Sequence, residues 1–248
     1  MSSKRTVLIT GANQGLGYEL ALKIGVNPAF HVILACRSET RGNEALEKLK
    51  AAGVQSASLL VVDITNPSSI SAATEILTKD YPSGLDVLVN NAGVALGGTT
   101  LEDFQTVYSV NVFGAALMTE ALTPLLKKSV EAGKADKKPA PQLLFLSSEL
   151  GSLAKQSDPE STFYKTNYLA YNSSKAALNM LMVGYSKDLK ESGVVVSGYD
   201  PGYVATALNG YSGPGEASKG IERLAELILE GDENTGKYYK WTGEELPW

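Results

Sequence analysis

The chain contains almost none of the residues that form disulfides or bind zinc. Cys36 is the only cysteine and His31 the only histidine among its 248 residues. A lone cysteine excludes an internal disulfide, and the two residues together supply too few of the usual ligands for a zinc site. We therefore expect no metal, a reducing compartment, and structural roles for both side chains.

Long apolar runs are missing as well. The run at 7–10 is too short for a signal peptide or a membrane span, and we find no other run of the length that a span requires. We therefore predict a cytoplasmic protein without a membrane partner, with a peroxisomal or organellar address as the alternative.

Positive charge is not in excess either. The 22 lysine and arginine residues are outnumbered by 27 aspartate and glutamate residues, which gives a net charge of −5. Proteins that bind nucleic acid or anionic membranes usually carry a basic surface. The composition therefore favours a small-molecule partner and no nucleic acid.

The sequence instead alternates between strand and helix patterns. Apolar, β-rich runs predict strands at 7–10, 31–36, 57–62, 85–89, 142–147, 194–199 and 237–241. Helical spacing is found at 18–24, at 41–52, after Pro67, at 100–130 as two helices, from Tyr171 to 191, and at 216–230. This order predicts an α/β fold, a doubly wound parallel sheet, in one domain over 1–248. A mobile polar connector at 133–141 and an irregular stretch at 151–167 interrupt the pattern.

A glycine-rich turn follows the first strand. Residues 11–17 read GANQGLG and lead directly into a helix. Such a turn lets backbone amides and a helix N-terminus approach a pyrophosphate without interference from a Cβ. The spacing G-x-x-x-G-x-G differs from the G-x-G-x-x-G fingerprint, so a plain loop is the alternative. We expect dinucleotide binding through Gly11, Asn13, Gln14, Gly15, Leu16 and Gly17.

The nature of the dinucleotide depends on Arg37, which ends the second strand twenty residues beyond Gly17. An acidic residue at this place binds the ribose 2′-hydroxyl of NAD, whereas an arginine accommodates the 2′-phosphate of NADP. Arg37 therefore favours NADP(H), with NAD(H) possible. The alternative is a solvated arginine at a strand end, because Gln14 adds no second positive charge in the glycine turn.

Polar residues stand at further strand ends. In an open parallel sheet these ends line the crevice where a nucleotide lies. Asp63 could hold the adenine amino group there, or it could cap the helix after Pro67. Residues 90–93, NNAG, suggest close approach of a ligand, although the asparagines could instead tie neighbouring turns together. Asn111 is an amide in apolar surroundings and needs partners.

Tyr171 and Lys175 are the pair around which we expect the chemistry. On a helix, positions i and i+4 are neighbours, so the ammonium can reach the phenolic oxygen. A nearby positive charge lowers the pKa of a phenol from about 10 toward a range useful for proton transfer. The same spacing also occurs by chance, with a half-buried tyrosine and a merely solvated lysine.

Taken together and in order, these motifs resemble the short-chain dehydrogenase/reductase family, and within it the carbonyl-reductase-like branch. The motifs are TGANQGLG at 10–17, NNAG at 90–93, Asn111, Ser148, YNSSK at 171–175, and PG at 201–202. The likeness spans nearly the whole chain. It implies a single Rossmann domain with a seven-stranded parallel sheet, and the catalytic tetrad Asn111, Ser148, Tyr171 and Lys175. Ser148 is preferred to Ser147 because the family pattern is serine, two residues, glycine.

The resemblance also implies residue roles. Tyr171 donates a proton while a hydride passes from NADPH to a ketone or aldehyde, Ser148 stabilises the carbonyl oxygen, and Asn111 holds a water that links Lys175 to solvent. Beyond the glycine turn and Arg37, the expected cofactor contacts are Asp63, Ile64, Asn90, Ala92, Gly93, Tyr171, Lys175, Pro201, Gly202, Val204 and Thr206. Substrate-pocket candidates, chosen because they flank strand ends, are Glu149, Leu150, Tyr203, Leu208 and Tyr211.

Two features leave alternatives open. Ser148 precedes Tyr171 by 23 positions, more than is usual in the family, and the surplus at 154–167 resembles segments that can block the family's dimer face. The oligomeric state (monomer, dimer or tetramer) is therefore open. An NAD-dependent alcohol, steroid or polyol dehydrogenase and a non-catalytic dinucleotide-binding regulator are the alternative functions. The glycines around Tyr211 predict a lid at 209–215 that orders on binding.

Overall fold

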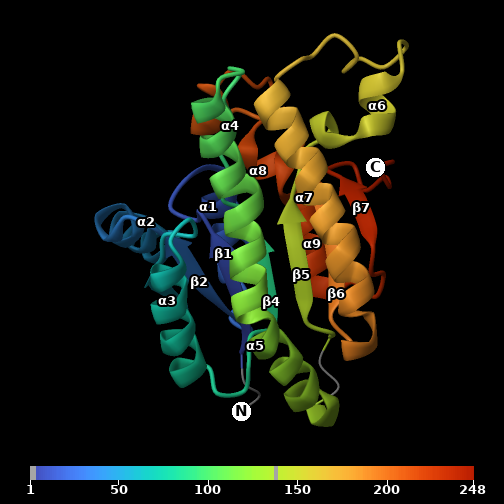
Figure 1. Ribbon diagram of the computed structural model, residues 1–248. Coiled ribbons are helices and arrows are strands. Elements are labelled where there is room, and N and C mark those ends of the chain that lie inside the picture. Colours follow the sequence, from blue (N-terminus) through green and yellow to red (C-terminus); the bar gives the residue numbers. More distant parts are fainter. Residues whose placement is uncertain (1–3, 137–138) are drawn as a thin grey trace.

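The protein forms one open sheet of seven parallel strands with helices on both faces (Figure 1). The computed structural model describes residues 4–136 and 139–248. The strands are β1 (Arg5–Thr10), β2 (Phe30–Cys36), β3 (Ala57–Val61), β4 (Val87–Asn90), β5 (Gln142–Leu146), β6 (Val195–Asp200) and β7 (Lys237–Lys240). Each lies within two residues of its predicted position at both ends, and the predicted Rossmann-type fold is confirmed.

The strand order is β3-β2-β1-β4-β5-β6-β7. The chain first moves outward from β1 to β2 and β3, and then returns to pair β4 with the other side of β1. In such sheets the point where the direction reverses leaves a crevice at the carboxyl ends of the strands. Here that point lies between β1 and β4.

Two apolar cores hold the helices against the sheet, because successive strand residues point to opposite faces. Leu8 faces one core, and Val7 and Ile9 face the other. The first core packs α3 (Pro67–Asp80), α5 (Ala115–Asp136) and α7 (Leu169–Asp188) on the sheet. The second packs α1 (Gly15–Gly25), α2 (Glu39–Ala51) and α9 (Glu222–Glu230). Both faces are thus covered, which leaves the strand ends as the place for a site.

The predicted pair of helices at 100–130 is one continuous helical stretch. Here α4 (Leu101–Tyr108) passes through a wider π-helical turn, η1 (Ser109–Gly114), into α5. Thr100 caps α4 through a capping box with Asp103. The connector predicted at 133–141 was wrong at its start, because α5 continues to Asp136. Residues 137–138 of the predicted connector lie outside the described residues.

The prediction that no stretch could span a membrane was wrong for Leu101–Gly133. By length and composition this helical stretch would suffice, and half of its most apolar window is buried inside the protein. Met118, Leu122 and Leu126 of α5 belong to the core beneath it. A core helix that covers a sheet has the same properties, so the finding carries no membrane assignment.

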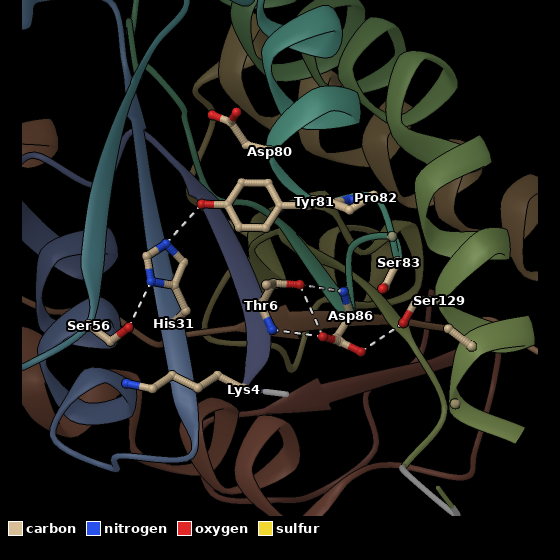
Figure 2. A pocket seen from close by; sticks show the side chains of 13 residues that line it. Lys4, Thr6, His31, Ser56, Asp80, Tyr81, Pro82, Ser83, Asp86 and Ser129 are labelled. Carbon is tan, nitrogen blue, oxygen red and sulfur yellow. Dashed lines mark hydrogen bonds between the residues drawn. The ribbon is translucent and has the colours of Figure 1, made fainter. Parts of the chain in front are cut away.

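The amino-terminal edge of the sheet is held by a buried carboxylate (Figure 2). Asp86, just before β4, accepts hydrogen bonds from Thr6 N at 2.7 Å and Thr6 Oγ1 at 3.0 Å with one oxygen. Its other oxygen accepts from Ser129 Oγ of α5 at 2.7 Å. One side chain therefore connects β1, β4 and α5 at a pocket of about 400 Å³.

His31 lies in the same pocket and is fully engaged by neighbours. Its Nδ1 lies 2.9 Å from Ser56 Oγ, and its Nε2 lies 2.9 Å from both Ser58 Oγ and Tyr81 OH. Burial lowers the pKa of His31. Cys36 is also buried, with Sγ 3.3 Å from the Ser38 carbonyl. The side chains of both residues are engaged by neighbouring residues, which agrees with the structural roles expected for them.

Asp86→Ala is predicted to destabilise the fold. The free energy of unfolding should fall by about 1 to 3 kcal/mol for each buried donor left without an acceptor. Asp80→Ala is the matched control, because Asp80 lines the same pocket but is exposed; it should change stability by less than about 0.5 kcal/mol. Equal losses in urea denaturation of the two variants would show that the Asp86 network is not what stabilises this edge.

Candidate active site

A cleft opens at the carboxyl ends of the strands, where the sequence placed the site. It has a volume of about 780 Å³ and receives residues from the loops that follow β1 to β6. Small-molecule sites usually measure about 300 to 1,000 Å³. The cleft is therefore large enough for a ligand that spans several strand ends.

The glycine turn forms one end of the cleft and needs its glycines for conformation and space. Gly11 and Gly15 have left-handed φ values of +67° and +56°. A Cβ at Gly11 would lie 3.0 Å from Ala92 Cα. Asn91 supports the turn, because its Nδ2 donates to Thr10 O at 2.6 Å. Asn91 therefore ties two neighbouring turns together, which is the alternative role predicted for the asparagines.

The start of α1 supplies free backbone donors beside this turn. Gln14 precedes the helix, and its side chain makes no capping hydrogen bond. Gln14, Gly15 and Leu16 all line the cleft. Uncapped amides at a helix N-terminus attract anions, because the first N–H groups lack partners in the helix. The turn therefore fits a pyrophosphate.

Arg37 and Asp63 lie together at the neighbouring strand ends. Arg37 is exposed and lines the cleft with Asp63 and Ile64. Hydrogen bonds from the Thr65 hydroxyl and amide lower the pKa of Asp63, and the Arg37 charge adds to the effect. The alternative that Asp63 caps the next helix is wrong, since Asn66 caps α3 by accepting from Ser68 N at 2.9 Å.

Tyr171 and Lys175 of α7 line the cleft, and so does Ser148. Lys175 Nζ is 5.7 Å from the centre of the Tyr171 ring and donates to Leu146 O at 2.8 Å. Ser148 Oγ accepts from Leu150 N at 3.2 Å, which leaves its hydroxyl hydrogen available. Ser147 is buried and bound to Asn179 instead. Both serines line the cleft, but only Ser148 keeps its hydroxyl hydrogen available there.

The pKa of Tyr171 is not lowered as expected, and Lys175 is not among the groups that shift it. The pKa of Tyr171 is raised to about 12, first by burial and then by the negative charge of Asp200, while the Ser148 hydroxyl opposes the rise. Burial lowers the pKa of Lys175 to about 8, and Asp200 opposes that change. Near neutral pH the phenol is therefore protonated.

Asn111 lies within the π-helical turn, close to Lys175. Its Nδ2 donates to Val94 O at 2.9 Å and to Ser174 Oγ at 3.0 Å, and its Oδ1 accepts from Val94 N at 2.8 Å. Gly93 lies between Asn111 and Lys175, since a Cβ there would be 3.4 Å from Asn111 Oδ1 and 3.8 Å from Lys175 Nζ. The buried amide thus has the partners that its apolar surroundings require.

Most of the other predicted site residues also line the cleft: Gly11, Asn13, Ala92, Gly93, Pro201, Gly202, Val204, Thr206, Glu149, Leu150, Tyr203 and Leu208. Gly17, Asn90, Asn111 and Tyr211 are not among the lining residues. Asn90 donates to Thr119 Oγ1 at 2.9 Å, and Tyr211 is 70% exposed. Glu149 is buried, with its carboxylate 2.6 Å from Lys155 Nζ and 3.5 Å from Lys240 Nζ.

Sequence reasoning missed part of the cleft wall. Phe163 and Tyr168 come from the stretch before α7, and Leu96 comes from the loop after β4. The irregular stretch at 151–167 is also less irregular than predicted, because it contains α6 (Leu153–Ser157). The sequence did contain a signal for this wall, namely aromatic residues in an otherwise polar stretch just before α7. Asp200, at the end of β6, was also missed.

The predicted lid is a loop closed by its own hydrogen bonds. Asn209 accepts from Thr206 N at 3.2 Å and donates to Val204 O at 2.8 Å. Val204 also forms a bridge with Gly215, which joins the two ends of the loop. Tyr211 adopts a left-handed φ of +62°, a conformation that few residues other than glycine take. The side-chain amide of Asn209 thus holds the loop together with backbone bonds such as that from Tyr211 N to Thr206 O at 2.9 Å.

Comparison with known proteins gives consistent matches. Residues 5–217 match the family described as short chain dehydrogenase. The chain is 33% identical to short-chain dehydrogenase/reductase tropE of Talaromyces stipitatus, with 100% of this chain and 99% of that protein covered. It is 41% identical to mouse carbonyl reductase [NADPH] 1 over 51% of this chain and 47% of that protein.

A solved structure gives a similar result. The NADPH-bound carbonyl reductase from chicken fatty liver superposes with a TM-score of 0.86 at 28% identity, covering 99% of this chain and 100% of that one. The likeness therefore extends over the sheet and the cleft together.

Asn209→Ala should loosen the loop at 209–215. We expect faster chymotrypsin cleavage between Leu208 and Ala217, because the variant loses both hydrogen bonds of the amide. NADPH with a carbonyl substrate should slow cleavage of the unchanged protein at the same place. Asn27→Ala is the control, since it removes a comparable side-chain contact to Ala29 N far from the loop. Cleavage that is indifferent to Asn209 and to ligands would identify a fixed loop.

Proposed function

The chain belongs to the short-chain dehydrogenase/reductase family, and from this premise we propose that it is an NADPH-dependent oxidoreductase that reduces a ketone or aldehyde to an alcohol. The observation that carries the proposal is the shared cleft, which holds Tyr171, Ser148 and Lys175 beside the uncapped glycine turn and Arg37. We further propose that residues 1–248 act as one dinucleotide-binding domain in the cytoplasm.

Binding of the cofactor is assigned to groups along the cleft. The glycine turn and the start of α1 would hold the pyrophosphate, Arg37 would hold the 2′-phosphate, and Asp63 and Ile64 would contact the adenine. Lys175 binds the ribose, and the segment from Pro201 to Thr206 binds the nicotinamide. Once bound, NADPH supplies the hydride that the carbonyl carbon accepts.

Tyr171 supplies the proton in this proposal. Its pKa of about 12 keeps the phenol protonated near neutral pH, which is the form that donates to a carbonyl oxygen. Ser148 donates a hydrogen bond to that oxygen as negative charge develops on it. The ammonium of Lys175 stabilises the phenolate left behind, and a water held at Asn111 returns the proton from solvent.

The substrate end of the cleft has apolar walls. Leu96, Leu150, Phe163, Tyr168, Tyr203 and Leu208 line it. Side chains of this kind favour an apolar carbonyl compound over a small polar one. The similarity to mouse carbonyl reductase [NADPH] 1 and to the NADPH-bound carbonyl reductase from chicken supports the same assignment. A screen of ketones, aldehydes and quinones that follows NADPH absorbance tests it.

Tyr171→Phe should lower turnover by a factor on the order of 10² to 10⁴, the usual loss for a positioned general acid. NADPH affinity should barely change, because the ring, Lys175, Arg37 and the glycine turn remain. Lys175→Ala should lower turnover and NADPH affinity together. Fluorescence titration with NADPH beside steady-state rates separates the two patterns, and near-native turnover of Tyr171→Phe would place the proton donor elsewhere.

Arg37→Asp should weaken NADPH binding far more than NADH binding. The change replaces a phosphate partner with a repelling charge and loses charge-assisted hydrogen bonds worth about 1.5 to 3 kcal/mol. Arg41→Asp is the matched control, because Arg41 is also exposed and close in sequence but lies outside the cleft. If Arg37→Asp weakened both cofactors equally, the NADP assignment would fail and an NAD-linked dehydrogenase would be favoured.

A further inference from the structure

Asp200 is a buried carboxylate in the cleft to which the proposed mechanism gives no role. It is the last residue of β6, is 3% exposed, and lines the cleft together with Tyr171, Lys175 and Ser148. Burial of an ionised carboxylate is unfavourable unless hydrogen bonds or opposite charges compensate for it. The groups that compensate the buried charge of Asp200 therefore indicate its role.

The carboxylate joins the two loops that flank the catalytic serine and the proposed nicotinamide site. One oxygen accepts from Glu149 N at 3.0 Å, directly after Ser148. The other accepts from Gly202 N at 3.0 Å, in the loop that begins at Pro201. Gly202 has a φ of +73°, so this amide is presented by a backbone conformation that favours glycine. Asp200 thus fixes the spacing between the loops that follow β5 and β6.

Ionisable groups face Asp200 from every neighbouring element. Tyr171 and Lys175 come from α7, Glu149 from the turn after β5, Lys240 and Tyr238 from β7, and Tyr199 from β6 itself. Lys240 lies 3.5 Å from the carboxylate of Glu149, which also pairs with Lys155. In the described residues Asp200 itself has no salt bridge within 4.0 Å. Backbone amides, rather than a cation, hold its charge.

That charge acts on the proposed catalytic pair. Burial raises the pKa of Asp200 to about 6, so the group is largely ionised near neutral pH. Its negative charge raises the pKa of Tyr171 and also raises that of Lys175 against the effect of burial. A carboxylate at this place therefore favours a neutral phenol next to a charged ammonium.

We propose that Asp200 is a positioning residue that holds the Ser148 loop to the Gly202 loop and places its negative charge in the cleft that Tyr171 and Lys175 line. This inference rests on the proposed function. Reduction requires the phenol, which gives its proton to the carbonyl oxygen as the carbon gains the hydride. Alcohol oxidation requires the phenolate, which takes the alcohol proton as the hydride leaves for NADP⁺. With Asp200 ionised, the enzyme should therefore keep its reductase activity up to a higher pH, and its alcohol-oxidation activity should begin only at a higher pH. The equilibrium between carbonyl and alcohol is unchanged.

Asp200→Asn tests the charge while keeping the shape of the side chain. Loss of the negative charge should move the rising limb of the pH profile of alcohol oxidation to lower pH, by an amount on the order of one unit. The falling limb of carbonyl reduction should move the same way. Below its pKa, Asp200 of the unchanged enzyme is itself protonated and neutral. The rates of the two proteins should therefore differ less at acidic than at alkaline pH.

Asp232→Asn is the matched control, because Asp232 is another buried carboxylate that accepts hydrogen bonds from Ser197 Oγ and Asn234 N, does not line the cleft, and is not among the groups that shift the pKa of Tyr171. The control variant should leave the limbs of both pH profiles at the same pH as in the unchanged enzyme. A uniform fall in rate for Asp200→Asn with unmoved limbs would overturn the charge role and leave only a structural one. If Asp200→Asn does not fold, Asp200→Ser, which is neutral and keeps one acceptor, takes its place.

A second measurement does not need turnover. The phenolate absorbance of Tyr171 is obtained as the difference between each protein and its Tyr171→Phe counterpart during an alkaline titration without cofactor. Asp200→Asn should bring this titration to lower pH, and an unchanged titration would overturn the inference. A shifted titration in a protein that turns over no carbonyl compound would instead show that the proposed function is wrong while the electrostatic role of Asp200 holds.

Discussion

The contact between β1 and β4 is the constraint on which the site depends. These strands meet where the strand order reverses, and each end of the contact is fixed by side chains. At the amino-terminal end Asp86 binds Thr6, and at the carboxyl end Thr10 Oγ1 accepts from Asn91 N and Ala92 N, both at 3.0 Å. The glycine turn leaves β1 at this second contact, so its backbone position is set by strand pairing rather than by a ligand. A cleft formed in this way is organised before anything binds.

Burial is the second constraint, and it decides the electrostatics of the cleft. Lys175 and Asp200 are each at most 5% exposed, and both are held by backbone groups at strand ends. A carbonyl binds the cation, and amides bind the anion. Because these partners belong to the sheet and its tight turns, they cannot reorient freely, and the two charges keep their places around Tyr171. The phenol of Tyr171, with its pKa raised to about 12, stays protonated near neutral pH.

The sequence allowed the sheet to be predicted almost to the residue, because buried parallel strands are short apolar runs bounded by polar turns. Residues that a local pattern defines, such as Gly11, Gly15 and the pair Tyr171 and Lys175, were found in the same way. The pKa of Tyr171 was wrong because helical spacing indicates proximity to a lysine but not the extent of burial, which depends on the whole fold. Asp200 was missed for a related reason: its influence comes from residues that pack on it from α7 and β7, which no local pattern reveals.

The wall of the substrate end depends on contacts still further along the chain. The segment that carries Phe163 and Tyr168 begins at Ser152, whose hydroxyl donates to Pro247 O at 2.8 Å, and Ala154 N donates to Trp248 O at 3.2 Å. Trp248 in turn stacks on Tyr238 of β7, with ring centres 5.3 Å apart. The added segment is thus anchored to residues near the end of the chain, while Tyr171 and Lys175 are carried by α7 and Ser148 follows β5. Tyr238 also faces Asp200, and Lys155 of the added segment pairs with Glu149 next to Ser148, so the cleft wall and the proposed catalytic groups share part of their support.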